Sequence, residues 1–219
     1  MAPQFHDRTQ AGRALARRLL KMALTPPIVV LALPRGGVPV AVQVARALHA
    51  PLDLLLVRKI GAPMQPELAV AAIVDGDPPE LVDDEQIQAA CGVSRDFVLA
   101  AADVEQQENV RRREAYLHGR APLPLQGATA IVVDDGIATG TTVRAALLAL
   151  RRRKPARLIL AVPVAPADTL ARLRAEVDDI ICLAQPDPFH AVGLHYLDFR
   201  QVDDDEVRAA LDAVTASSR

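Results

Sequence analysis

Two adjacent carboxylates, followed by a loop of small and hydroxyl-bearing residues, are the part of this chain best suited to chemistry. They occur in residues 131–142, Ile-Val-Val-Asp-Asp-Gly-Ile-Ala-Thr-Gly-Thr-Thr. Asp134 and Asp135 can accept hydrogen bonds from a diol, and the backbone N–H groups and hydroxyls of the loop can surround a phosphate. This combination predicts a site for a phosphorylated sugar.

A strand and a helix must position these groups. Residues 131–133 form an apolar, β-branched run of the kind found in strands buried on both faces of a parallel sheet. The Ala- and Leu-rich residues 143–153 predict a helix whose N-terminus points at the loop. Its N–H groups and macrodipole would favour an anion there by roughly 0.3–1 kcal/mol.

The complete string separates three interpretations of the acidic pair. A tight strand-to-helix turn or a response-regulator receiver would also place acids after a strand, but a receiver carries them near the start of its domain. The string resembles the 5-phosphoribosyl-1-pyrophosphate (PRPP) motif of type I phosphoribosyltransferases. The resemblance implies that Asp134 and Asp135 hold the ribose 2′- and 3′-hydroxyls. It implies that the 5′-phosphate side is formed by Gly136, Ala138, Thr139, Gly140, Thr141 and Thr142.

A second loop, Arg35-Gly36-Gly37, lies between a predicted strand at 28–33 and a predicted helix at 38–49. Glycines let a backbone approach an anion closely, and a guanidinium can bridge two phosphate oxygens. A simple glycine turn with an exposed arginine is the structural alternative. The family places its pyrophosphate loop here, so the resemblance implies that role and also a cis peptide, which we expect at Arg35–Gly36.

Two further charged residues, Lys59 and Glu67, are candidates for the reaction. Arg58 and Lys59 follow a predicted strand at 52–57, and either could be solvated. We favour Lys59 as the contact to pyrophosphate, since a compact ammonium suits a departing phosphate anion. Glu67 could act as a general acid or base, or could only cap a neighbouring element.

Aromatic residues gather near the C-terminus, within residues 186–199. They could form a small core that packs the tail. Alternatively, the stretch resembles the hood of hypoxanthine-guanine phosphoribosyltransferases, in which a ring stacks on the base. That resemblance makes Phe189 and Tyr196 the stacking candidates and Asp198 a candidate for holding magnesium with pyrophosphate.

Alternating strands and helices predict an α/β fold with a twisted, mainly parallel sheet flanked by helices, as in the type I phosphoribosyltransferases. We expect one domain, 1–219, with a core at about 28–183 and a hood at about 184–205 followed by a terminal helix. A first helix should run from Asp7 or Thr9 to about Met22. The expected strands are 28–33, 52–57, 68–74, 129–133, 158–162 and 180–183.

Residues 75–126 break the alternation. They predict a short helix near 84–91 and a long polar helix that Ser94 could cap and Gly119 could stop. The segment could be an ordinary helical insertion. By resemblance to the family it could instead be a lid that closes over the bound sugar.

Composition narrows the class of protein. The chain has 219 residues, 51% of them hydrophobic, and a formal charge of −2, which gives no bulk attraction to nucleic acid. Its apolar runs are shorter than the ~18–20 residues needed to cross a bilayer, and its two cysteines lack metal-ligand spacing. We therefore expect a cytoplasmic protein with neither a nucleic-acid nor a membrane partner, and by analogy with the family a homodimer or homotetramer.

The resemblance implies transfer of a phosphoribosyl group from PRPP to a nitrogen of a nucleobase or similar heterocycle, with release of pyrophosphate and a requirement for Mg²⁺. Two alternatives remain open: a regulator that binds PRPP without turnover, and an α/β module that uses the loop for another phosphorylated ligand. An intact Arg35-Gly36-Gly37 loop with Lys59 favours turnover.

Overall fold

The computed structural model describes residues 4–217; residues 1–3, 218 and 219 of the expected domain lie outside the described part. Five parallel strands form the central sheet in the order β2-β1-β6-β7-β8. This confirms the predicted α/β fold with a parallel sheet. The strands are β1 (Ile28–Ala32), β2 (Leu52–Leu54), β6 (Thr129–Val133), β7 (Arg157–Val164) and β8 (Asp179–Ala184).

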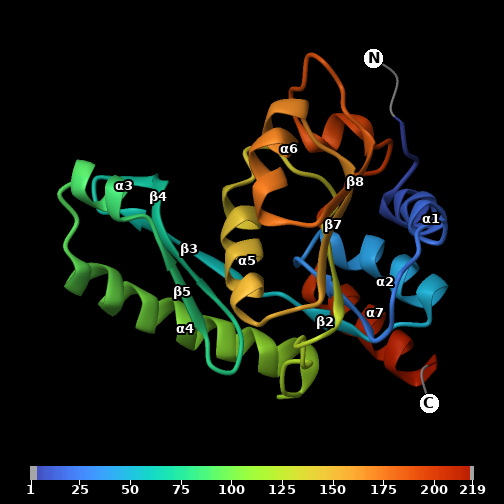
Figure 1. Cartoon of the computed structure of the whole chain (residues 1–219), viewed down its shortest axis with the longest axis horizontal. Helices are drawn as coiled ribbons and strands as arrows, with labels where there is room; N and C mark the ends of the chain where they lie inside the picture. The colour runs from blue at the N-terminus through green and yellow to red at the C-terminus, as the bar shows by residue number, and fades with distance from the viewer. Residues whose placement is uncertain (1–3, 218–219) are drawn as a thin grey trace.

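Helices cover both faces of this sheet because its strands are apolar on both sides. Val30 and Ile131 pack toward α1 (Arg8–Leu19), α2 (Gly37–Leu48) and α7 (Asp204–Ser217). The alternate residues, such as Leu31 and Val132, pack toward α5 (Thr141–Arg152) and α6 (Ala167–Leu173). Figure 1 shows the two helical layers on opposite sides of the strands. Fully buried runs of this kind are typical of parallel sheets.

The chain changes direction between β1 and β6. From β1 it passes through α2 to β2 on one side, whereas from β6 it passes through α5 to β7 on the other. The two strands pair in register, with Ala32 opposite Val133, so their carboxyl ends are level. In open α/β sheets this switch point is where ligands bind.

One group of expected strands was assigned to the wrong sheet. β3 (Val57–Ala62), β4 (Gln65–Val74) and β5 (Glu80–Asp83) form a separate antiparallel sheet, so the strand predicted at 68–74 does not join the parallel one. A run of apolar residues reports burial but not the pairing partner. The departure from the parallel alternation therefore begins at Val57, before the expected insertion at 75–126.

A short and a long helix complete the insertion. α3 (Glu85–Ala90) is capped by Asp84, and α4 (Arg95–Leu117) is capped by Ser94 as predicted. Near its start, α4 packs Val98 and Ala102 against the antiparallel sheet. Near its end, Tyr116 and Leu117 join the core of the parallel sheet. The helix thus connects the two sheets, as its course along the lower edge of Figure 1 shows.

A buried arginine fixes α4 to the core. Arg113 Nε lies 2.6 Å from an Asp75 carboxylate oxygen, and its Nη1 lies 3.3 Å from Asp53. Its guanidinium also donates to the carbonyls of Leu54 and Arg120. All three charged side chains are at most 10% exposed. Such a network holds its partners firmly because any one charge left alone would be costly.

The remaining elements differ little from expectation. α1 is capped by Asp7 as expected but ends at Leu19 instead of about Met22. A short 3₁₀ helix, η1 (Arg174–Glu176), follows α6, and a second, η2 (Val192–His195), lies in the hood region. Within residues 4–217, no helix has both the length and the apolar character needed to cross a bilayer.

Candidate functional site

The two predicted loops meet at the carboxyl ends of β1 and β6. Leu33 donates to the Val133 carbonyl at 3.0 Å, which continues the strand pairing into the loops. A Cβ atom on Gly36 would lie 2.1 Å from an Asp135 carboxylate oxygen, and one on Gly37 would lie 2.8 Å from the Val133 carbonyl oxygen. Glycine is therefore required at both positions by close approach, and the sequence-predicted loop and acids are brought together.

The expected cis peptide is displaced by one residue. The structure has it at Pro34–Arg35, so the prediction of Arg35–Gly36 was wrong; the family resemblance places such a bond in the loop but does not fix its register. The Arg35 guanidinium lies 3.3 Å from Asp204 at the start of α7. Tyr116 donates to the same carboxylate at 2.7 Å, and these two contacts, Tyr116 first, lower the pKa of Asp204.

Asp135 is held by groups that the sequence analysis did not identify. Arg8, the first residue of α1, pairs with its carboxylate at 2.7 Å, and the Arg8 guanidinium lies 3.9 Å above the Phe199 ring. Tyr196 donates its hydroxyl to the Asp135 carbonyl at 2.5 Å. Nothing in the spacing of Arg8 marks it, because its partner is 127 positions away.

Asp134 has a different environment. Its carboxylate accepts a hydrogen bond from the Asp135 N–H at 2.8 Å, and no ion pair to it exists among the described residues. Burial, and then the neighbouring Asp135 charge, raise the pKa of the Asp134 carboxyl well above its usual value. A hydroxyl donor or a cation placed beside Asp134 would relieve this cost.

The phosphate loop ends in an open helix N-terminus. Gly140 has a φ of +78°, which only glycine adopts easily, and α5 begins at Thr141, two residues earlier than predicted. No side chain caps this helix end. The exposed Thr139, Thr141 and Thr142 surround it, so its N–H groups are available to an anion.

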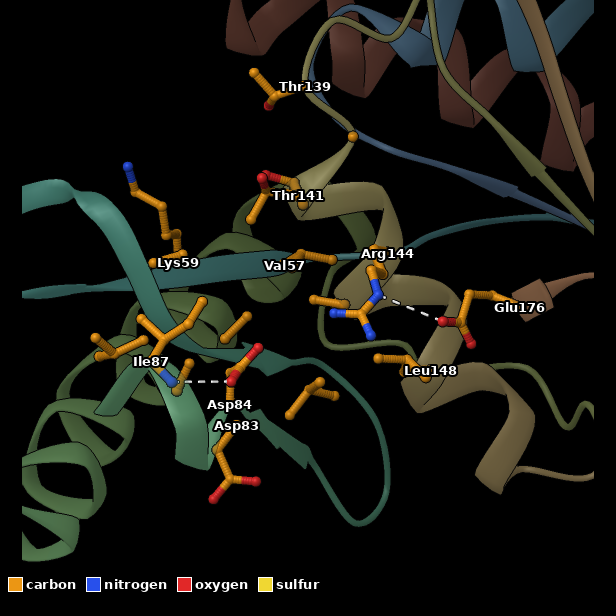
Figure 2. A pocket seen from close by; sticks show the side chains of 18 of the residues that line it. Val57, Lys59, Asp83, Asp84, Ile87, Thr139, Thr141, Arg144, Leu148 and Glu176 are labelled. Carbon is orange, nitrogen blue, oxygen red and sulfur yellow. Dashed lines mark hydrogen bonds and ion pairs between the residues drawn. The ribbon is translucent and has the colours of Figure 1, made fainter. Parts of the chain in front are cut away.

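A cleft of about 550 Å³ opens from this loop toward the antiparallel sheet (Figure 2). Lys59 lies at the end of the cleft that holds Thr139 and Thr141. Its ammonium pairs with Glu67 at 3.0 Å, and the Glu67 side chain is 99% exposed. Glu67 lines neither this cleft nor the two neighbouring cavities, so in this arrangement it neutralises Lys59.

A second cavity, of about 770 Å³, separates the phosphate loop from the hood. Phe189 lines it together with Ala138 and Thr139. Tyr196 does not: it is 4% exposed and packs between Phe5 and Phe199. The Tyr196 ring therefore has no open face for a base, and burial raises the pKa of its hydroxyl, which remains a donor. This residue belongs to the small tail core that was the alternative interpretation.

A third cavity, of about 200 Å³, lies between the first loop and α4. Asp134 and Thr142 line it on the core side, and Pro34 lines it next to Arg35. On the other side it is lined by Arg58 and two α4 residues that sequence reasoning missed, Asn109 and Arg112. A long polar helix gives no indication of which of its turns reaches a neighbouring loop.

Carboxylates do not form a ready-made metal cage. Within residues 4–217, no group of three or more His, Cys, Asp or Glu side chains is arranged to hold a metal ion. Asp198 is exposed and accepts a hydrogen bond from the Arg200 N–H at 3.1 Å. It lines none of the three cavities.

The parallel sheet, the switch point and the two adjoining loops define the type I phosphoribosyltransferase fold. Residues 3–198 match the phosphoribosyl transferase domain family. The chain belongs to this family.

Relatives agree with this assignment. Two Mycobacterium tuberculosis proteins, from strains CDC 1551 and H37Rv, have names that place them with the phosphoribosyl transferases and are 46% identical over 212 residues. The match covers 95% of this chain but 46% of each relative, so the chain spans about half their length. The crystal structure of TT1426 from Thermus thermophilus is 41% identical, has a TM-score of 0.81, and is matched over 95% of this chain and 97% of that one.

Proposed function

We propose that this protein transfers the 5-phosphoribosyl group of PRPP to a ring nitrogen of a nucleobase or similar heterocycle and releases pyrophosphate. One observation carries the proposal: the Arg35-Gly36-Gly37 loop abuts the acidic pair, with Gly36 in direct contact with Asp135. A ligand that bridges these loops needs a diol to contact the two acids and an anionic group to contact the loop that follows them. It needs a second anionic group to contact the Arg35-Gly36-Gly37 loop. PRPP has this arrangement.

Each part of the substrate then has a place. The ribose hydroxyls donate to Asp134 and Asp135, and the 5′-phosphate lies on the N-terminus of α5 among Ala138, Thr139, Gly140, Thr141 and Thr142. The pyrophosphate lies beside the Gly36 and Gly37 amides and Arg35. The acceptor nitrogen bonds to C1 as the bond from C1 to the pyrophosphate oxygen breaks, and the proton of the nitrogen passes to solvent. Positioning supplies most of the rate enhancement.

Most of the ligands of a magnesium ion at this site would come from the substrate and water, and few from the protein. The side chains offer the Asp134 carboxylate next to the first loop and no cage of three ligands in the described part of the chain. Mg²⁺ usually keeps several waters and uses one or two carboxylates plus substrate phosphates. When bound, it would neutralise charge on the leaving pyrophosphate. We do not place it at Asp198.

The acceptor would occupy the cavity between the phosphate loop and the hood. That cavity adjoins Thr139, so a base there would be next to C1 of a ribose whose phosphate lies on the loop. Phe189 is the aromatic ring that lines it, and we propose that it stacks on the base. The exposed Asp187 and His190 at its rim would contact the edge of the heterocycle.

The test measures pyrophosphate release from PRPP with Mg²⁺ against a panel of purines, pyrimidines and related heterocycles. The Asp134→Asn/Asp135→Asn double variant is the control. Release that depends on one acceptor and disappears in the control supports transfer and identifies the acceptor. Calorimetric PRPP binding without turnover on any acceptor would instead favour the regulator, and absence of PRPP binding would reject both.

A further inference from the structure

We propose that the insertion forms part of the substrate site: Asn109 and Arg112 of α4, with Arg58 of β3, bind the pyrophosphate group from the side opposite the Arg35-Gly36-Gly37 loop. This inference rests on the proposed function and deepens it. It assigns the leaving group to the cavity of about 200 Å³ between α4 and the acidic pair.

Asn109 is the first observation. Its side chain is fully buried, yet neither its amide nitrogen nor its amide oxygen has a hydrogen-bond partner within the described structure. A buried polar group without a partner destabilises the fold, and such groups in native proteins need an explanation. Because Asn109 lines the cavity, an oxygen of a bound anion can accept from its amide nitrogen.

The two arginines are the second observation. Arg58 Nε pairs with Glu105 at 2.6 Å, and Arg112 Nε pairs with Glu108 at 2.8 Å, so carboxylates of α4 hold both guanidinium groups in place. Neither arginine makes another hydrogen bond within residues 4–217, which leaves the terminal nitrogens of both for a ligand. Two fixed guanidinium groups beside an amide donor suit a compact, highly charged phosphate anion.

The direction of β3 decides between Arg58 and Lys59. Successive side chains of a strand point to opposite faces. Arg58 lines the small cavity with Asp134, whereas Lys59 lines the large cleft and pairs with Glu67. We therefore assign the pyrophosphate contact to Arg58 instead of Lys59. The insertion then lines one side of the binding site, whether or not it also closes over the substrate as a lid.

Arg111 and Arg112 provide a matched experiment. Both pair with Glu108 from the same helix turn, but only Arg112 lines the cavity. Isothermal titration of the full chain with inorganic pyrophosphate, and separately with PRPP, compares Arg112→Gln with Arg111→Gln at equal net charge. We expect affinity for both ligands to fall about 10- to 100-fold in Arg112→Gln and to stay within about twofold in Arg111→Gln.

Asn109→Leu separates binding from folding. Replacing an unpaired buried amide with an apolar group of similar size should leave the melting temperature unchanged or higher, while pyrophosphate affinity falls about tenfold. Gln106→Leu is its control, because the Gln106 side-chain oxygen is also buried without a partner but the residue does not line the cavity. Asn109→Asp, which places a negative charge there, should weaken pyrophosphate binding further.

The outcomes distinguish this inference from the proposed function. If wild type binds PRPP and pyrophosphate, and Arg112→Gln and Asn109→Leu bind both as wild type does, α4 is not part of the site and the inference is wrong. The inference would also be overturned if Asn109→Leu lost pyrophosphate affinity and its free energy of unfolding fell by as much as its binding free energy. The lost affinity would then follow from the damaged fold and not from a lost contact. If wild type binds neither ligand, the proposed function is rejected together with the inference.

Discussion

The parallel core and the insertion line opposite sides of the small cavity beside Asp134, and each is held in place by different means. In the core, strand pairing and glycines set the geometry: Gly36 touches Asp135 with no room for a side chain. In the insertion, charged side chains set it, and Arg113 fixes α4 through Asp53 and Asp75. Close backbone contacts leave no space for a larger side chain, whereas an ion network loses its stability when any one of its charged side chains is removed. The loop at Gly36 should therefore be most sensitive to added volume, and the anchor of α4 most sensitive to the loss of a charge.

Arg113→Leu tests the insertion side and should have the largest effect. It leaves the buried carboxylates of Asp53 and Asp75 without their partner, so we expect the free energy of unfolding to fall by about 3–5 kcal/mol. Urea denaturation measures this, and hydrogen exchange should show α4 losing protection first.

Arg111→Leu is the control for this experiment, because Arg111 is 70% exposed and its pair with Glu108 lies at the surface. The free energy of unfolding should change far less in this variant than in Arg113→Leu, because solvent screens an exposed ion pair. Equal losses in the two variants would contradict an anchoring role for Arg113.

Gly36→Ala tests the core side. The added Cβ would meet Asp135 at 2.1 Å and displace the acid or the loop, so turnover of PRPP should fall by about 100-fold. Stability should change less than in Arg113→Leu. Gly92→Ala, where the added atom meets nothing, should cost only the ~1 kcal/mol of a left-handed residue and leave turnover intact. Full turnover in Gly36→Ala would contradict the claim that the close contact of Gly36 with Asp135 sets the geometry of the core side.

Asp134→Asn and Asp135→Asn should change stability in opposite directions. Burial and the Asp135 charge raise the pKa of the Asp134 carboxyl, so its ionised form destabilises the fold, and Asp134→Asn should raise the melting temperature. Asp135→Asn removes the partner of the buried Arg8 and should lower it. Thermal scans without ligand measure both, and a common direction would contradict the assigned environments.

The raised pKa of Asp134 also predicts that the stability of the fold depends on pH. At a pH below the unfolded-state pKa, Asp134 is protonated in both states and has no electrostatic cost. As pH rises from that value through the raised folded-state pKa, the folded protein must give up a proton it binds more tightly than the unfolded chain does, so wild type loses stability relative to Asp134→Asn. Urea titrations of both proteins at several pH values measure the difference, and a constant difference would argue against the shift.

Glu67→Gln should have the smallest effect. Its side chain is almost fully exposed, so its pair with Lys59 is screened and contributes little. PRPP affinity should change by less than about twofold, with any change toward tighter binding as the Lys59 ammonium loses its partner. A large loss of turnover without a loss of binding would restore the acid or base role considered for Glu67.

The sequence predicts the core better than the insertion for a physical reason. Strand 129–133, the acids and the loop that follows are local in sequence, and their pattern of burial and turn residues is enough to order them. The strand predicted at 68–74 is equally apolar, but its partners are antiparallel, and composition does not encode the partner. The insertion was expected to begin at residue 75, whereas the antiparallel sheet already begins at Val57.

The sequence indicates which side chains have the chemistry to bind a substrate, but it does not show which cavity each side chain lines. Arg58 and Lys59 are neighbours of the same charge, and only the direction of β3 shows which cavity each one lines. Tyr196 has the ring that base stacking requires, yet its hydroxyl bonds the Asp135 carbonyl and the ring is enclosed. Arg8 reaches Asp135 because the start of α1 lies beside Phe199 of the hood, at the opposite end of the sequence.

The pairing of β1 with β6 has a consequence for the order of folding. Val30 pairs with Ile131, so roughly a hundred residues, including the whole insertion, are made before the central pair of strands can form. Until then one edge of an apolar β1 stays open, and long-range parallel pairing of this kind is slow. The two loops that meet at the acidic pair are therefore completed late, when the nascent chain can first close its sheet.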